Sequence, residues 1–215
     1  MMDKDKILNS EIDGESEIDD KSKPICKKTK NEIVEEAKSQ QAKLEKITII
    51  NRELKKINNL LRHIDRVKNA AQILADRLIE QDEIYLARRL IAKSLCHDYS
   101  KFLGIEWDYL VKSDGQEEVS GDNLKLAIYH HTSSNDHHPE YWGCNINNMS
   151  QESMAEMVCD LHARASEAGT DLRSYIKDVF CKKHNISHSG KGYKSMKRFI
   201  DLLLDTPLKP IQLNN

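Results

Sequence analysis

The sequence predicts an all-α protein. Apolar residues recur with helical period through most of the chain, and the alternating runs typical of half-buried strands are absent. Gly and Pro, which interrupt helices, number only 8 and 4 among 215 residues. Lys, Glu, Leu and Ile are frequent, with 32% charged and 39% hydrophobic residues, a mixture typical of soluble helical proteins. We therefore expect one helical domain with an appendage.

The sequence of the first 61 residues predicts a tail followed by a helix. Residues 1–30 are polar and bury too little apolar surface to fold, so we expect a disordered tail. Residues 31–56 are assigned as a helical extension. Its seam alternates steps of three and four residues and runs through Ile33, Ala37, Gln40, Leu44, Ile47, Asn51, Leu54, Asn58 and Leu61. The seam fits either a coiled coil, with self-association through residues 31–61, or a helix lying along the domain's own surface.

Residues 57–204 are expected to form the compact domain, followed by a C-terminal tail over 205–215. Apolar periodicity predicts the helices of the domain. The segments 104–120 and 132–148 are predicted to be irregular, the first with at most one helical turn. The expected helices cover residues 57–78, 82–100, 122–131, 149–169, 171–180 and 192–204.

The charge balance and the cysteines narrow the class of protein. With 33 basic and 35 acidic residues, the chain lacks the global electrostatic signature of a nucleic-acid-binding protein, and nucleic acid is not an expected partner. The five cysteines are scattered without a C-x-x-C pair, as in reduced intracellular proteins. The sequence contains no signal-peptide core and no apolar run of roughly 18 residues. We expect a cytoplasmic protein that does not enter a membrane.

Polar side chains at the rim of the predicted core suggest a metal site. His63 lies at the margin of the apolar stripe of its helix. Asp160 lies at the edge of the stripe formed by Met154, Met157, Val158 and Leu161. His97 and Asp98 are adjacent, and both project onto apolar sides of their predicted helix. Each has a structural explanation when taken alone, as a packed histidine or a paired or solvated acid. Together they favour a metal ion, because buried imidazoles and carboxylates are costly without a partner.

Four further histidines lie within nine residues. They form two pairs, His130 with His131 and His137 with His138. His131 projects onto the apolar face of its predicted helix, so we favour it over His130 as a ligand, while the choice between His137 and His138 stays open. Imidazole and carboxylate ligands suit zinc, manganese, iron or nickel better than calcium.

The ordered set of a His, a His-Asp pair, clustered histidines and an Asp resembles the HD superfamily of metal-dependent phosphohydrolases. His63 in LRHIDRV, His97 and Asp98 in CHDYSKF, and Asp160 in MVCDLHA match its ordered ligands. More narrowly, HHTSSNDHHPEYW followed by MSQESMAEMVCDLHARAS resembles a small family of uncharacterised HD-like proteins of bacteria and phages. The resemblance covers residues 57–204 and implies an HD-domain-like helical bundle, here with an N-terminal helical extension.

The resemblance also implies roles for individual residues. One or two divalent transition-metal ions (Mn, Fe, Ni, Zn or Co) would be held by His63, His97, Asp98, His131, His138 and Asp160. Lys101 matches a lysine that lies near the substrate phosphate in many relatives, so it would contact the phosphate and take a catalytic role. The position of Arg66, one helical turn from His63, suggests a contact with the same phosphate. A histidine that does not bind metal, His130 or His137, would act as the general acid. Dinuclear relatives separate their later histidines by a longer stretch, so the second ion stays open.

The expected activity is hydrolysis of a phosphate ester by metal-activated water, with a nucleotide as the commonest substrate class of the superfamily. Two alternatives stay open. Some proteins with the HD fold are di-iron oxygenases, which would require redox-active iron. Alternatively the site is vestigial, and the chain is a non-catalytic binding or regulatory module that acts through its N-terminal helix.

Overall fold

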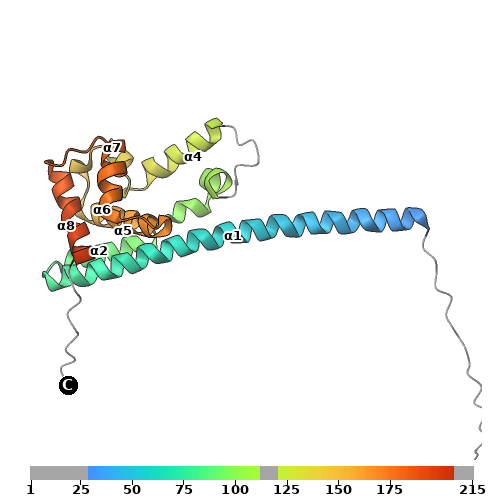
Figure 1. The fold of residues 1–215 in the computed structure, drawn as a ribbon, viewed down its shortest axis with the longest axis horizontal. Coiled ribbons are helices and arrows are strands. Elements are labelled where there is room, and N and C mark those ends of the chain that lie inside the picture. The colour runs from blue at the N-terminus through green and yellow to red at the C-terminus, as the bar shows by residue number, and fades with distance from the viewer. Residues whose placement is uncertain (1–28, 112–120, 206–215) are drawn as a thin grey trace, which may run out of the picture. The chain divides into compact units, whose positions relative to one another are not determined.

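The computed structural model describes residues 29–111 and 121–205. Every regular element in these ranges is a helix, which confirms the predicted all-α class (Figure 1). Most of the predicted tails 1–30 and 205–215, and the second half of the predicted loop 104–120, lie outside the described residues. Among the described residues, no helix has the length and apolar character needed to cross a membrane.

Helices α1 to α8 are linked by turns and by short 3₁₀ and π-helical segments. The 3₁₀ segments are Tyr99–Phe102, Pro139–Trp142 and Ile146–Asn148, and the π-helical segments are Trp107–Val111 and Ile176–Phe180. The helices are α1 (Lys30–Glu80), α2 (Ile84–Leu95), α3 (Gly104–Glu106), α4 (Gly121–Ser134), α5 (Gln151–Ala168), α6 (Leu172–Tyr175), α7 (Cys181–Lys183) and α8 (Lys191–Asp205).

Helix α1 is continuous over its length because no Gly or Pro interrupts its sequence. The chain divides into two compact units between Lys46 and Ile47, so the described part of the first unit is the start of this helix, where every residue is exposed. Apolar seam residues of both units are exposed, namely Ile33, Leu44, Ile47, Leu54 and Leu61. Self-association through residues 31–61 stays a prediction.

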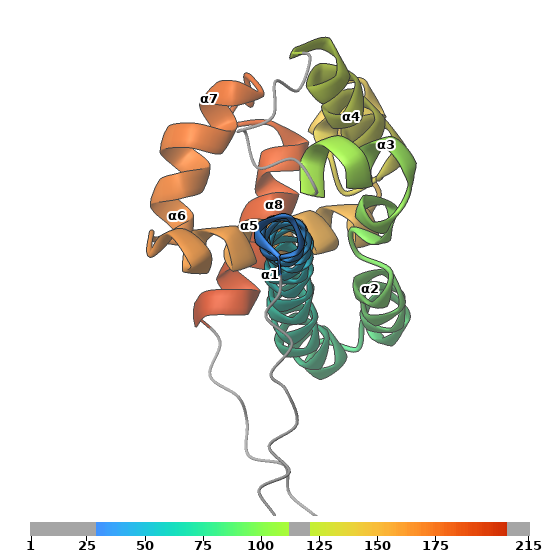
Figure 2. The ribbon, with the colours of Figure 1, turned by 90° about the vertical axis from the view of Figure 1, so that its right-hand side faces the viewer.

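The main hydrophobic core lies in the second unit, around α5. The buried stripe of α1 from Val67 to Leu78 packs into this core with residues of α2, α5 and α8. Figure 2 shows α5 between a group formed by α6, α7 and α8 and a group formed by α2, α3 and α4. Ser150 caps α5 by accepting a hydrogen bond from the Ser153 amide, at 3.2 Å, and Gly169 ends the helix in the left-handed conformation.

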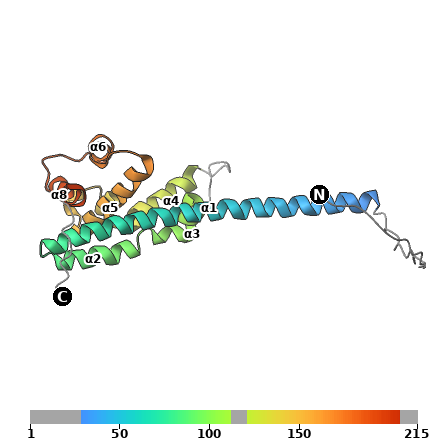
Figure 3. The same cartoon turned by 60° about the horizontal axis from the view of Figure 1, so that its bottom comes forward.

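A tight turn sends α2 back along the C-terminal end of α1, as Figures 1 and 3 show. Asp82 provides the reversal with a left-handed φ of 62°, a conformation that Asp tolerates better than most residues. Helix α2 then ends at Leu95, which is earlier than predicted, because the amides of Cys96 and His97 bond to carbonyls only three residues back and tighten the last turn.

The segment 104–120 is more ordered than the sequence predicts. It is helical from Gly104 to Val111, which exceeds the single turn expected for a loop. Val111 packs on Leu60 and Ile64 of α1, and this contact holds the segment on the second unit. Tertiary packing therefore fixes a helix that local sequence does not signal.

Candidate metal centre

Side chains from three helices and two turns converge at one buried place. His63 comes from α1, Asp160 from α5 and His131 from α4. The other four follow the ends of helices, with His97 and Asp98 after α2 and His137 and His138 after α4. Six of the seven side chains are buried and His138 is half-buried.

The turn after α2 delivers the His-Asp pair. Projection along a helix predicts that both side chains face inward, and both are buried, with exposures of 2% and 1%. Their backbone, however, is a turn and not the helix that the sequence predicts. Asp98 adopts a left-handed φ of 57° and starts the 3₁₀ segment that carries Lys101. This reversal lets two adjacent residues, His97 and Asp98, point toward the same centre, which a regular helix would spread 100° apart.

The first ligand group is formed by His63, His97 and Asp160. The Nε2 atom of His63 lies 3.0 Å from Asp160 Oδ1, and the Nε2 atom of His97 lies 3.7 Å from the same oxygen. Both nitrogens also face Oδ2 of Asp98, at 3.8 and 3.6 Å.

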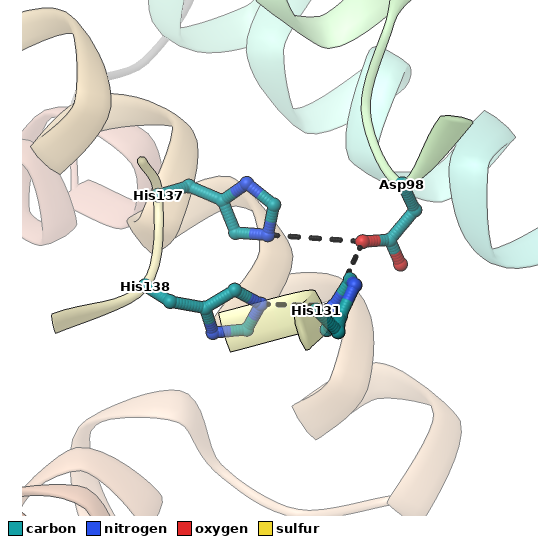
Figure 4. A group of neighbouring side chains, drawn as sticks. All are labelled: Asp98, His131, His137 and His138. Carbon is teal, nitrogen blue, oxygen red and sulfur yellow. Dashed lines mark hydrogen bonds and ion pairs between the residues drawn. The ribbon is translucent and has the colours of Figure 1, made fainter. Parts of the chain in front are cut away.

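The second ligand group is formed by Asp98, His131, His137 and His138, and Figure 4 shows the three rings turned toward one another and toward the carboxylate. Oδ1 of Asp98 lies 3.3 Å from His131 Nε2 and 3.7 Å from His137 Nε2. The Nε2 atoms of His131 and His138 are 3.0 Å apart and hydrogen-bonded. Asp98 thus presents one oxygen to each group, as a carboxylate between two ions would.

The spacing and the unpaired atoms fit a bound cation. Metal–ligand bonds of about 2.1 Å place neighbouring ligand atoms about 3.0–3.4 Å apart, close to the 3.0–3.8 Å between these atoms. Five buried atoms of the cluster that could bind a metal ion have no hydrogen-bond partner among the described residues. They are His63 Nε2, His97 Nε2, His137 Nε2, Asp98 Oδ1 and Asp160 Oδ1. Buried polar atoms are rarely left unpaired, so their convergence indicates a ligand that pairs with all of them.

Two glutamates fix the rings of the first group. Glu156 on α5 accepts from His97 Nδ1 at 3.1 Å, and Glu167 accepts from His63 Nδ1 at 3.0 Å. An ionised carboxylate can only accept, so each Nδ1 carries a proton and Nε2 is the ring nitrogen that faces the centre. Glu167 also accepts from Arg66 at 3.1 Å. Neither glutamate is predicted, because an acid on a charged helix is most simply a solvated residue.

Glu106 orients a histidine ring of the second group in the same way. Its carboxylate, which is fully buried, accepts from His131 Nδ1 at 2.8 Å and from His130 Nδ1 at 2.6 Å. The hydroxyl of Ser100 donates to it as well, at 2.8 Å. Sequence reasoning misses Glu106 because it assigns residues 104–120 to a loop. An acid after the His-Asp pair, inside an apolar GIEWDYLV segment, is the signal that could have found it.

The centre favours positive charge. Burial disfavours an imidazolium at His97, but the nearby carboxylates of Asp160, Glu156 and Asp98 outweigh burial and raise the His97 pKa to about 10. Burial raises the pKa of a carboxyl group, yet the neighbouring histidines hold the pKa of Asp98 and of Asp160 below its usual value. Two ionised carboxylates therefore call for cations, either protons on imidazoles or metal ions.

The later histidines are held neutral. Burial, followed by the charge of His97, lowers the pKa of His137 to about 4. Burial is also the largest cause of the lowered pKa of His131 and of His138. Since a neutral imidazole is the form that binds metal, these three rings are in the ligating state at neutral pH.

Two cations contact the ligand carboxylates. Lys101 Nζ donates to Asp98 Oδ2, and Arg164 Nε lies 3.1 Å from Asp160 Oδ1. Lys101 is one of the residues that the sequence suggests, whereas Arg164 is not, although its position four residues after Asp160 on α5 places it one turn away.

The structure thus brings together all six residues that the sequence suggests as metal ligands, and it adds His137 to them. His130 stands apart from both ligand groups. Its side chain is 53% exposed and contacts Glu106 rather than Asp98. The sequence leaves open whether His137 or His138 is a ligand. In the structure both rings lie in the second ligand group.

A family model described as a family of unknown function, DUF5662, matches residues 52–200, more than half of the chain. The chain belongs to the DUF5662 family. The DUF5662 match includes both ligand groups and the three glutamates that orient the rings, and it begins within α1. No curated protein and no solved structure matches the chain.

Proposed function

We propose that this DUF5662 protein is a metal-dependent phosphohydrolase that cleaves a phosphate ester, with a nucleotide as the first substrate class to test. The observation that carries the proposal is the convergence of buried, unpaired imidazole nitrogens and carboxylate oxygens around Asp98. The resemblance of His63, the His97-Asp98 pair and Asp160 to the ordered ligands of the HD superfamily supports it.

His63, His97 and Asp160 would hold one divalent ion and His131, His137 and His138 a second, with Asp98 between them. A bound transition metal supplies Lewis acidity toward water and toward a phosphoryl oxygen. Nitrogen and oxygen donors of this kind suit Mn, Fe, Co, Ni or Zn. We therefore reassign His137 from the general-acid role to the ligand set.

The remaining roles belong to the chain's own side chains. Lys101 and Arg66 lie beside the first group and offset the charge of a phosphate bound there. Arg164 adds a third cation on the α5 side. His130, whose ring is half-exposed and shares Glu106 with His131, is the histidine outside the ligand groups that can donate a proton to a leaving oxygen.

The same ligand atoms would also suit two iron ions, as in a di-iron oxygenase. The charged residues around the centre therefore have to distinguish a phosphohydrolase from an oxygenase. Lys101, Arg66 and Arg164 surround the approach to His63, and cations at this place favour an anionic substrate over the activation of dioxygen. A vestigial site is disfavoured, because the ligand atoms still converge and the rings are still oriented by glutamates, of which Glu106 and Glu156 are buried.

The test measures metal content by plasma mass spectrometry in the wild type and in Asp98→Asn. Asn tolerates the left-handed backbone at this position but supplies only one acceptor oxygen. Asp82→Asn is the matched control, since Asp82 has the same backbone conformation and is exposed at the α1–α2 turn. We expect one or two equivalents of metal in the wild type and in Asp82→Asn, and loss of metal in Asp98→Asn.

Activity is then measured on a panel of nucleotides and simple phosphate esters with added Mn²⁺. Hydrolysis that is present in the wild type and absent in Asp98→Asn supports the proposal. A wild-type protein that is free of metal and cannot be loaded refutes it. Bound iron with dioxygen consumption and no phosphate release would replace it with the oxygenase alternative.

A further inference from the structure

The apolar seam of α1 is open to solvent. In the second unit, Ile47, Leu54 and Leu61 are each about half-exposed, at 53%, 49% and 45%, so the core that buries the other face of the helix leaves this seam uncovered. In the first unit, Ile33 and Leu44 lie on a stretch where every described residue is exposed. Contiguous exposed apolar surface of this kind marks an interaction site.

The spacing of the seam is that of a coiled coil. Its steps of three and four residues place Ala37, Leu44, Asn51 and Asn58 at the a positions of a heptad. Its d positions hold Ile33, Gln40, Ile47, Leu54 and Leu61. The pattern extends over about four heptads, the length at which it favours a coiled coil, and helices gain most of their stability from packing such a face.

A hollow of about 510 Å³ follows the seam within the second unit. It is lined by successive seam residues and by the residues that directly follow Leu54 and Leu61, namely Asn51, Leu54, Lys55, Asn58, Leu61 and Arg62. In a coiled coil a side chain of one helix inserts into the hole between four residues of the facing helix. The hollow therefore lies where the side chains of a second helix would insert.

The two asparagines of the seam select the orientation of that second helix. In a parallel, in-register pair of identical helices each seam residue faces its own counterpart, so the side-chain amides at position 51 bond to each other, as do those at position 58. In an antiparallel pair an a residue faces a d residue. Gln40 is the one polar residue at the d positions, so no antiparallel alignment gives both Asn51 and Asn58 a polar residue to face. Buried amides without a partner are costly, which favours the parallel pair.

The residues that flank the seam fit the same arrangement. In a parallel pair the g residue of one helix lies beside the e residue of the next heptad on the other helix. This brings Ile50 to Lys55 and Ile57 to Arg62, so like charges do not meet. The alkyl stems of Lys and Arg cover apolar side chains while their charged ends stay in water.

We propose that two copies of this chain pair through α1 as a parallel, in-register coiled coil over residues 33–61, with Asn51 and Asn58 each bonded to its own counterpart. The partner is a second copy because the asparagines are satisfied by identical residues at identical heights. The inference goes beyond the proposed function and is independent of it, since every seam residue lies outside the ligand groups.

The first test is disulfide formation in the full chain under mild oxidation. Ile47→Cys and Leu54→Cys each place a thiol at a d position, where the two copies lie face to face in a parallel pair. Ile49→Cys is the matched control, since Ile49 is also an exposed isoleucine but lies at an f position that points away from the partner. Peptide mass spectrometry separates the new disulfide from any formed by the exposed Cys96 or Cys144.

The second test is sedimentation equilibrium of Asn51→Asp at neutral pH. In the parallel pair this change brings two carboxylates together in the seam, so the dissociation constant of the dimer should rise at least tenfold. Asn59→Asp is the matched control, because Asn59 is exposed, lies outside the seam and keeps its acceptor for Arg62. Its dissociation constant should stay within twofold of the wild-type value.

We expect a dimeric wild type and a disulfide between the two copies in Ile47→Cys and Leu54→Cys, with none in Ile49→Cys. A wild type that is monomeric or trimeric would overturn the inference. A dimer in which neither d-position variant forms the disulfide would also overturn it, since the helices would then be antiparallel or joined elsewhere. Equal dissociation constants for Asn51→Asp and the wild type would refute the role of the asparagines.

Discussion

Glu156 offers the sharpest test of how the centre is held together. One oxygen of its carboxylate accepts from His97 Nδ1 at 3.1 Å, and the other lies 3.2 Å from Lys93 Nζ. In Glu156→Gln one of these acceptors becomes an NH₂ group that faces a donor. The variant therefore keeps the shape of the side chain while removing a charge and one hydrogen bond.

Loss of such a supporting group typically weakens metal affinity by about 10–100-fold. The effect is measurable as stability, because a ligand at about 100 times its Kd stabilises the fold by about 2.7 kcal/mol and at about 10 times its Kd by only about 1.4 kcal/mol. A tenfold weaker site at the same metal concentration thus lowers the metal-dependent stabilisation by about 1.3 kcal/mol. For a domain of this size that corresponds to about 3–5 °C in Tm.

The assay combines competition against a chromophoric chelator with thermal unfolding, each with and without Mn²⁺. Glu152→Gln is the matched control, since Glu152 lies one turn earlier on α5 and pairs with the exposed Arg89 at 3.3 Å. Such a pair contributes about 0–1 kcal/mol and touches no ligand. The reasoning is refuted when Glu156→Gln retains the wild-type metal affinity and the wild-type Tm shift on metal addition.

Three further predictions concern the fold, the thiols and α1. Leu74→Ala, in the fully buried stripe of α1, should lower the free energy of unfolding by about 3 kcal/mol in urea titration, and the half-exposed Leu204→Ala by less than about 1 kcal/mol. In brief alkylation followed by peptide mass spectrometry, exposed Cys96 should be labelled in the folded chain. Cys159, whose pKa burial raises, should be labelled only after unfolding. Sedimentation should show a dimer that Leu54→Asp converts to monomer, and a monomeric wild type would contradict self-association.

The sequence predicts correctly where side chains on regular helices point. His63 and Asp160 each lie at the margin of an apolar stripe, and the structure buries both as helical projection predicts. The all-α class follows from the same periodicity and is confirmed. These features depend on one element at a time, so the local pattern is sufficient.

The features that depend on tertiary contacts are the ones that the sequence does not reveal. Asp98 reaches the centre through a left-handed turn, not through the helix that the pattern over 82–100 predicts. Glu106 becomes a buried acceptor because the segment around it packs on α1 and turns helical. Glu156 is chosen among several acids of α5 only because His97 lies opposite it, a juxtaposition that no spacing in the chain records.

The order in which the ligands occur along the chain bears on how an ion is acquired. His63 and Asp160 meet at 3.0 Å, yet the second is synthesised on the order of a hundred residues after the first. A nascent chain that ends before α5 holds neither a complete first group nor the glutamate that orients His97. We therefore expect the proposed metal ion to bind after the helices have packed together, rather than to guide their packing. Refolding in chelator should yield a compact apoprotein, to which metal adds as a separate and later kinetic phase.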